Sequence, residues 1–113
     1  MAKSKVSLDM VRKLALALPG VKESTAYGKA ALKVHGKLLV CEPTHRSAEP
    51  DSIVIRIDAE QCASFLAEAP DIYYLPDHYV GYNCVLVRLS HITPEALRDL
   101  IRAAHRFVTR KST

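Results

Sequence analysis

The C-terminal stretch from Thr93 to Arg110 constrains the fold most, because it carries the clearest helical pattern in the chain. Thr93 is a good N-cap, Pro94 suits the first helical position, and Glu95 places negative charge at the positive end of the helix dipole. At about 100° per residue, its apolar side chains fall within one stripe of about 120°, the width of a core-facing helix. This buried stripe consists of Leu97, Leu100, Ile101, Ala104, Phe107 and Val108.

The opposite side of the predicted helix carries arginines at four-residue spacing, which form a row that drifts slowly around the helix. From residue 98 onward the chain has five Lys or Arg and one Asp, whereas residues 1–97 hold eleven of each sign. The formal net charge of +4 therefore arises in this stretch. A solvated helix face and a contact with nucleic-acid phosphate both explain the row. It consists of Arg98, Arg102, Arg106 and Arg110.

The length of 113 residues favours a single domain, residues 1–113, that buries a core without disulfide or metal staples. Hydrophobic residues at 49% and charged residues at 25% are ordinary globular values, and the apolar runs are too short to span a bilayer. No apolar signal-peptide core follows the polar first residues. We expect a cytoplasmic protein with no membrane contact; its oligomeric state stays open.

The remaining pattern predicts two more helices and several strands. Ser7 is expected to cap a helix that ends at Pro19-Gly20, and Asp58 a second one that ends at Pro70. Residues 30–41 have the pattern of a hairpin, and residues 53–57 and 84–90 alternate as strands. Residues 21–28 are interpreted as a polar connection and residues 42–52 as a loop between antiparallel strands. This order predicts an α+β domain with an antiparallel sheet and helices packed mainly on one face.

If each strand turns its apolar side toward the helices, four basic residues fall on the other face of the sheet: Lys33, His35, Arg56 and Arg88. That face would then be basic. The alternative is that these are single solvated residues on unrelated strands, since one exposed charge per strand is common.

An aromatic-rich segment follows the second predicted helix. Aromatic rings near basic residues can stack on unpaired bases or line a ligand groove. Packing at the edge of the sheet, with the hydroxyl groups in water, explains the same pattern. The residues of this possible groove are Tyr73, Tyr74, His78, Tyr79 and Tyr82.

No pattern in the chain predicts catalysis, and we expect no enzyme. The five histidines are scattered one per segment, and no catalytic motif surrounds a cysteine. Paired metal ligands and a phosphate-cradling glycine loop are missing, so neither a metal nor another cofactor is expected. Asp77 and His78 are adjacent, but Asp77 is better explained as a turn residue after Pro76. The three cysteines, Cys41, Cys62 and Cys84, lie in apolar patterns and are predicted to be reduced core thiols.

Two runs resemble a known family. Residues 14–40, LALALPGVKESTAYGKAALKVHGKLLV, have a helix ending in Leu-Pro-Gly, an acidic residue, an aromatic-Gly pair and a Lys-Val hairpin, and resemble the opening of the MmcQ/YjbR-like family. Residues 77–90, DHYVGYNCVLVRLS, followed by a Pro-Glu helix start, are similar to its second half. The resemblance implies an α+β domain described as a double-wing fold, with a DNA-binding and non-catalytic role.

Three classes of function remain after these arguments, and an enzyme of a type that no motif identifies is the least favoured of them. The first is a DNA-binding protein that contacts phosphate through the arginine row together with Lys33, Arg56 and Arg88. The second is an adaptor domain, in which the arginines meet an acidic protein partner or the tyrosines hold a small ligand. The salt dependence of binding to duplex DNA separates the first two classes, because neutralising phosphates makes affinity fall steeply with salt.

Overall fold

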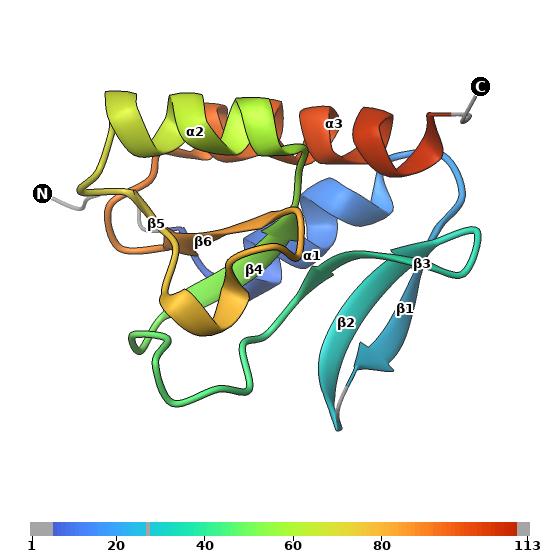
Figure 1. Ribbon diagram of the computed structural model, residues 1–113. Coiled ribbons are helices and arrows are strands. Elements are labelled where there is room, and N and C mark those ends of the chain that lie inside the picture. The colour runs from blue at the N-terminus through green and yellow to red at the C-terminus, as the bar shows by residue number, and fades with distance from the viewer. Residues whose placement is uncertain (1–5, 27, 111–113) are drawn as a thin grey trace, which may run out of the picture.

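The computed structural model describes residues 6–26 and 28–110 (Figure 1). Tyr27, the aromatic residue of the aromatic-Gly pair, lies outside the described residues. Within them, six strands form one antiparallel sheet in the order β1-β2-β3-β4-β6-β5. The strands are β1 (Val21–Ala26), β2 (Lys29–Val34), β3 (Lys37–Cys41), β4 (Ser52–Arg56), β5 (Tyr73–Tyr74) and β6 (Cys84–Arg88).

The three predicted helices are confirmed, together with their capping residues. Ser7, Asp58 and Thr93 each accept a hydrogen bond from a backbone N–H in the first turn of the helix that follows. Such caps satisfy donors that a helix cannot satisfy itself. The helices are α1 (Leu8–Leu16), α2 (Ala59–Glu68) and α3 (Pro94–Thr109), and a short 3-10 helix, η1 (Asp77–Tyr79), precedes β6.

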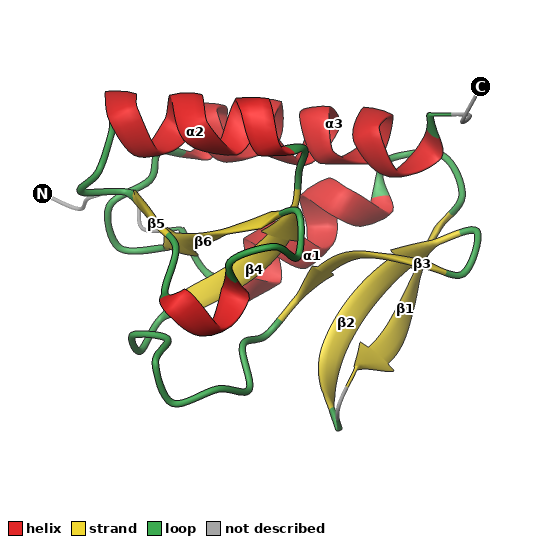
Figure 2. Ribbon diagram, in the orientation of Figure 1, coloured by secondary structure: helices red, strands yellow, loops and turns green. Residues whose placement is uncertain are grey.

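The main core lies between one face of the sheet and all three α-helices. Ile53 and Ile55 of β4 and Val85 and Val87 of β6 are fully buried there, as the alternating pattern predicts. The helices contribute buried side chains to the same cluster, among them Val11, Cys62 and Ile101. Figure 2 shows α2 and α3 along one side of the sheet and η1 on the other. The prediction of an α+β fold with helices on one face is confirmed.

The hairpin predicted for residues 30–41 is also confirmed, and it turns at His35-Gly36. Both turn residues have positive φ, 52° and 77°, which is typical of a two-residue turn that matches the twist of the strands. Leu32 and Val34 face the main core as expected.

The interpretation of residues 21–28 as a polar connection is wrong, because Val21–Ala26 forms β1. This strand is at the edge of the sheet and pairs only with β2. Lys22, Glu23 and Thr25 are exposed, and only Val21 is buried. An edge strand whose side chains are mostly solvated needs no apolar alternation, so the sequence pattern could not reveal it.

The face of the sheet away from the helices carries a second, smaller apolar cluster. Val54 and Leu86, which are partners across β4 and β6, are 6% and 0% exposed. Tyr79 of η1 packs against this cluster, as does Ala48 from the loop between β3 and β4. Of the two interpretations of this face, a basic surface is therefore excluded, because its centre is apolar and covered by irregular chain.

The prediction for the cysteines is confirmed within the described residues. Cys41, Cys62 and Cys84 are all buried and none is bridged. Cys62 of α2 belongs to the main core, whereas Cys41 and Cys84 belong to the smaller cluster on the opposite face. Burial raises the pKa of Cys41 and of Cys84 to about 11, so both are inert thiols near neutral pH.

Candidate nucleic-acid interface

The arginine row lies on the solvent side of α3. Arg98, Arg102, Arg106 and Arg110 are all exposed, while Leu97, Leu100, Ile101 and Ala104 on the other side are buried. Within residues 6–26 and 28–110, no carboxylate forms an ion pair with any of the four guanidiniums. The row is therefore a set of solvated positive charges, three of them on α3 and the fourth, Arg110, at its C-cap in extended backbone.

Arg56, at the end of β4, lies close to the C-terminal end of this row. Its guanidinium carbon is 5.9 Å from the centre of the Phe107 ring, and that of Arg110 is 5.4 Å from the same ring. Both distances are within the range of cation–π attraction. Phe107 is only partly buried, and its ring lies near both guanidiniums. The basic surface of α3 thus continues onto the sheet through Phe107 to Arg56.

Arg88, the arginine at the end of β6, has a different environment. Two of its nitrogens donate to the two carboxylate oxygens of Glu49, at 2.8 and 2.7 Å, and a third donates to the carbonyl oxygens of Pro70 and Asp71. Its guanidinium also stacks over the Tyr74 ring at 4.3 Å. The carboxylate raises the pKa of Arg88, and the guanidinium lowers the pKa of Glu49. With its donors occupied, Arg88 ties the β3–β4 loop and the turn after α2 to β6.

Lys33 and His35 do not join the two arginines. Lys33 is half-buried on β2 opposite Leu38 of β3, and His35 is in the exposed hairpin turn. Arg56 and Arg88 share a face of the sheet, but Val54 and Leu86 separate them. The four residues therefore do not form a continuous basic surface.

The aromatic residues of the predicted groove divide into three groups. Tyr73 faces the main core, where its ring packs 4.8 Å from that of Phe65. Tyr74 lies on the other face, and its hydroxyl group is 2.6 Å from Ser52 Oγ and accepts from Glu49 N–H at 2.7 Å. Only His78, Tyr79 and Tyr82 come together, around a cavity next to η1.

This cavity, of about 430 Å³, lies on the sheet face opposite the helices, between β3, β4 and the segment from η1 to β6. Val54, Cys41 and Cys84 form its apolar floor, and Arg56 reaches it from the end of β4. From the sequence, Arg56 was predicted to contact phosphate and the aromatic residues to form a ligand groove. In the fold, Arg56 and three of these aromatic residues line the same cavity. We call this the Arg56 cavity.

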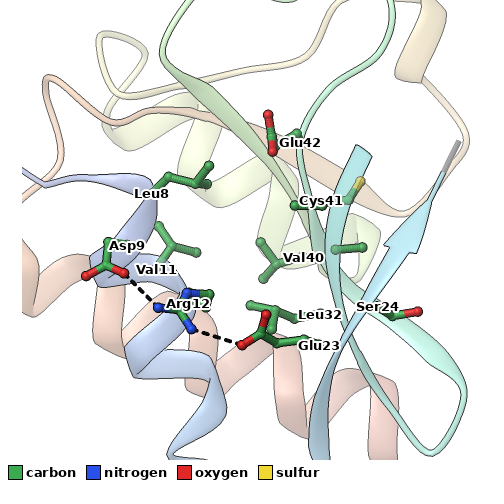
Figure 3. Close-up of a pocket in the computed structure, with 12 residues that line it drawn as sticks. Leu8, Asp9, Val11, Arg12, Glu23, Ser24, Leu32, Val40, Cys41 and Glu42 are labelled. Atoms are coloured by element: carbon green, nitrogen blue, oxygen red, sulfur yellow. Dashed lines mark hydrogen bonds and ion pairs between the residues drawn. The ribbon is translucent and has the colours of Figure 1, made fainter. Parts of the chain in front are cut away.

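A second cavity, of about 290 Å³, lies between α1 and strands β1 to β3 (Figure 3). Its cation is Arg12, which donates to Asp9 and Glu23, each at 2.9 Å. Figure 3 shows the three charged side chains joined at the rim, with Val11, Leu32 and Val40 deeper in the cavity. Two carboxylates neutralise Arg12, so the unpaired charge at this cavity is that of Glu42, which lines both cavities and has no ion pair among the described residues.

A family model named YjbR matches residues 16–107, most of the chain. The chain belongs to the YjbR family. The matched region includes α2, the Arg56 cavity and most of α3, and it confirms the resemblance carried by residues 14–40 and 77–90. YjbR is not a known enzyme family.

The crystal structure of Deinococcus radiodurans protein DR2400, with the family-model domain DUF419, resembles this YjbR chain in fold. The TM-score is 0.76 at 19% sequence identity, and the similarity covers 98% of this chain and 84% of that chain. No curated protein matches the sequence. The comparisons thus establish the family and the fold of this YjbR protein.

Sequence reasoning missed His45, which is part of the aromatic cluster beside the Arg56 cavity. The His45 ring stacks on that of His78 with the centres 3.7 Å apart, and its backbone N–H donates to the Tyr79 hydroxyl group at 3.3 Å. Burial and the positive charges of His78 and Arg46 lower the pKa of His45. His45 lies in a loop without periodicity, so no local signal could have paired it with a residue 33 positions later.

No three His, Cys, Asp or Glu side chains in residues 6–26 and 28–110 come close enough together to hold a metal ion. None of the helices described is long and apolar enough to cross a membrane.

Proposed function

We propose that this YjbR protein binds nucleic acid through the arginine row of α3, by attraction to phosphate rather than by reading base sequence. The observation that carries the proposal is the exposure of Arg98, Arg102 and Arg106 on α3 and of Arg110 at its C-cap, with no ion pair to a carboxylate in the described part of the chain. Such charges are available to a polyanion without first breaking an internal pair.

The spacing of the row fits a phosphate backbone. Four-residue steps place the guanidiniums about 6 Å apart along the helix axis, comparable with the separation of successive phosphates along one strand. Each step also rotates the side chain by about 40°, so a straight duplex meets two or three arginines at once. Guanidinium groups can hold phosphate oxygens with two parallel hydrogen bonds.

The position of Arg56 extends this surface in one direction. Arg56 and Arg110 lie near the same Phe107 ring, so a strand that follows the row toward its C-terminal end reaches Arg56 next. Arg88 is excluded from the proposed surface because Glu49 holds it. Lys33 contributes at most a peripheral charge, since it is half-buried on β2.

The test is the salt dependence of binding to a random DNA duplex. Each neutralised phosphate contributes about 0.9 to the slope of log affinity against log salt. Arg102→Ala with Arg106→Ala should therefore reduce the slope by about two and weaken binding to all sequences similarly. The matched control is Lys22→Ala with Lys29→Ala, which removes the same charge from exposed positions on β1 and β2.

The control distinguishes binding through the arginine row from attraction by the overall charge of the protein. If both double variants lose affinity equally, the protein attracts DNA only through its overall charge, and the proposal is wrong. If the parent protein does not bind duplex or single-stranded DNA or RNA, the row instead meets an acidic protein or only water. Unfolding temperatures of both variants must stay near that of the parent protein for the comparison to count.

A further inference from the structure

The Arg56 cavity combines an apolar floor, an aromatic wall and an arginine with unoccupied donors. Its volume of about 430 Å³ is in the range of sites for small organic ligands. The floor is apolar, with Val54, Cys41 and Cys84 each less than 8% exposed. Tyr79 belongs to the same buried cluster, whereas Arg56, His78 and Tyr82 are less buried, as in binding sites where a few polar groups orient an apolar ligand.

One end of the cavity is positive. Arg56 uses Nε to donate to the carbonyl oxygen of Asn83 at 3.2 Å. Neither of its two Nη atoms has a hydrogen-bond partner or carboxylate among residues 6–26 and 28–110. Arg110 places a second guanidinium nearby, with its carbon 5.4 Å from the centre of the Phe107 ring. This end therefore presents donors that suit a carboxylate or phosphate group.

One wall of the cavity is aromatic. The rings of His78 and Tyr82 are 6.4 Å apart and inclined by 32°, and the Tyr79 ring stands edge-on to His78 at 5.0 Å. Tyr82 is 62% exposed, which is unusual for so large a side chain with a cavity beside it. A planar ring that entered the cavity would cover the face of Tyr82 and gain stacking in addition to burial.

The other end of the cavity is negative. Glu42 follows Cys41, whose partner across the sheet is Val54, whereas Arg56 lies two residues beyond Val54 in the opposite direction. At about 3.3 Å per residue, the two charged residues are separated by about 10 Å along the strands. A ligand with its anionic group at Arg56 would thus place its far end near a carboxylate.

From this arrangement we infer that the Arg56 cavity binds a small planar aromatic compound with an anionic group at one end and a hydrogen-bond donor at the other. The anion pairs with the Nη atoms of Arg56, the ring lies against Tyr82 over the floor of Val54 and Cys84, and the donor reaches Glu42. This site adjoins the arginine row and shares Arg56 with the proposed nucleic-acid surface, but small probes test it independently of nucleic-acid binding.

The test uses four related probes, measured by calorimetry and by amide shifts in two-dimensional NMR: 2-naphthoate, 2-naphthyl phosphate, 6-amino-2-naphthoate and the neutral 2-naphthamide. The two simple anions should bind saturably and at least about tenfold more tightly than the amide, the factor that about 1.4 kcal/mol provides. Comparing carboxylate with phosphate shows which anion the site prefers. The amino group should improve on 2-naphthoate.

Three variants and one control test which part of the ligand each side chain contacts. Arg56→Met should weaken all three anions about tenfold and leave the amide unchanged, Tyr82→Ala should weaken all four probes, and Glu42→Gln should remove only the advantage of the amino group. Arg102→Met, with the same change of charge on α3, should leave all four affinities unchanged. The inference is overturned if no probe binds saturably, if the amide binds as well as the acids, or if Arg56→Met and Arg102→Met have equal effects.

Discussion

Arg56 and Arg88 are the same residue type, on adjacent strands and on the same face of the sheet, yet their surroundings differ. Arg88 is held by a bidentate carboxylate, two backbone carbonyls and a tyrosine ring, and its side chain is only 21% exposed. Arg56 is held by one backbone carbonyl beside a cavity. Occupied donors indicate a structural role, whereas unoccupied donors next to a cavity and a basic helix indicate a binding role.

The surroundings of Arg56 and Arg88 differ because different segments cover the two ends of this sheet face. At the Arg88 end, the loop between β3 and β4 brings Glu49, and the turn after α2 brings two carbonyls. At the Arg56 end, the nearby groups are Phe107 and Arg110 of α3, which supply a ring and another cation. The comparison predicts opposite responses to mutation at the two ends.

The largest expected effect concerns Cys84, which is the cross-strand partner of Arg56. With its pKa raised to about 11 by burial, only about one thiol in a thousand is ionised at pH 8. Alkylation of Cys84 and Cys41 should therefore be slow in native protein and accelerate about tenfold per pH unit. A probe bound in the Arg56 cavity should slow labelling of these two cysteines further but not that of Cys62. Fast labelling of Cys84 at pH 8 would show that this end of the face is open.

Arg88→Ala should destabilise the protein by about 2 kcal/mol, because it leaves a carboxylate and two carbonyls without their charged donor. Urea unfolding measures this as a lower midpoint with an unchanged slope. DNA affinity, measured where the variant is folded, should remain that of the parent protein. A stable Arg88→Ala variant with weakened DNA binding would reverse the assignment of the two arginines.

Glu49→Gln should reduce stability by a smaller amount, and the loss should depend on pH. The pKa of Glu49 is lowered by Arg88 in the folded state, so the ion pair stabilises above the ordinary glutamate pKa and is lost as pH falls through the folded-state pKa. Unfolding midpoints of parent and variant should differ at pH 7 and converge in acid. If the two unfolding midpoints differ by the same amount down to acid pH, packing rather than the ion pair holds this loop.

Arg56→Ala should have the smallest effect on stability, less than about 1 kcal/mol, because it removes one hydrogen bond to a carbonyl and a weak ring contact. The same urea experiment measures it beside Arg88→Ala. A loss equal to that of Arg88→Ala would show that Arg56 is a structural residue and would remove the basis for the Arg56 cavity as a binding site.

Most of the fold was predictable because its signals are local. Ser7, Asp58 and Thr93 mark helix starts by a short polar side chain before an apolar stripe, and the isoleucines of β4 alternate with a period of two. β1 lacks such a signal because it is an exposed edge strand that forms by pairing with β2. Local patterns reveal buried elements and miss those that only pairing specifies.

The candidate sites were less predictable, because they depend on contacts distant in the sequence. The exposure of the arginine row follows from helical spacing alone. The pairing of Arg88 depends on Glu49, 39 residues earlier. The environment of Arg56 depends on Phe107 and Tyr82. Alternation placed both arginines on one face correctly, but it could not show that an apolar cluster separates them or that a loop neutralises one.

The most direct test of this account is an NMR titration of the parent protein with a short DNA duplex, observing the Nε–H signals of the arginine side chains. We expect Arg102, Arg106 and Arg110 to shift most, Arg56 to shift less, and Arg88 to remain unchanged because Glu49 occupies its donors. These shifts should disappear at high salt, since the contacts are to phosphate. Shifts centred on Arg88 and the β3–β4 loop, or no shift in any arginine of α3, would contradict the account.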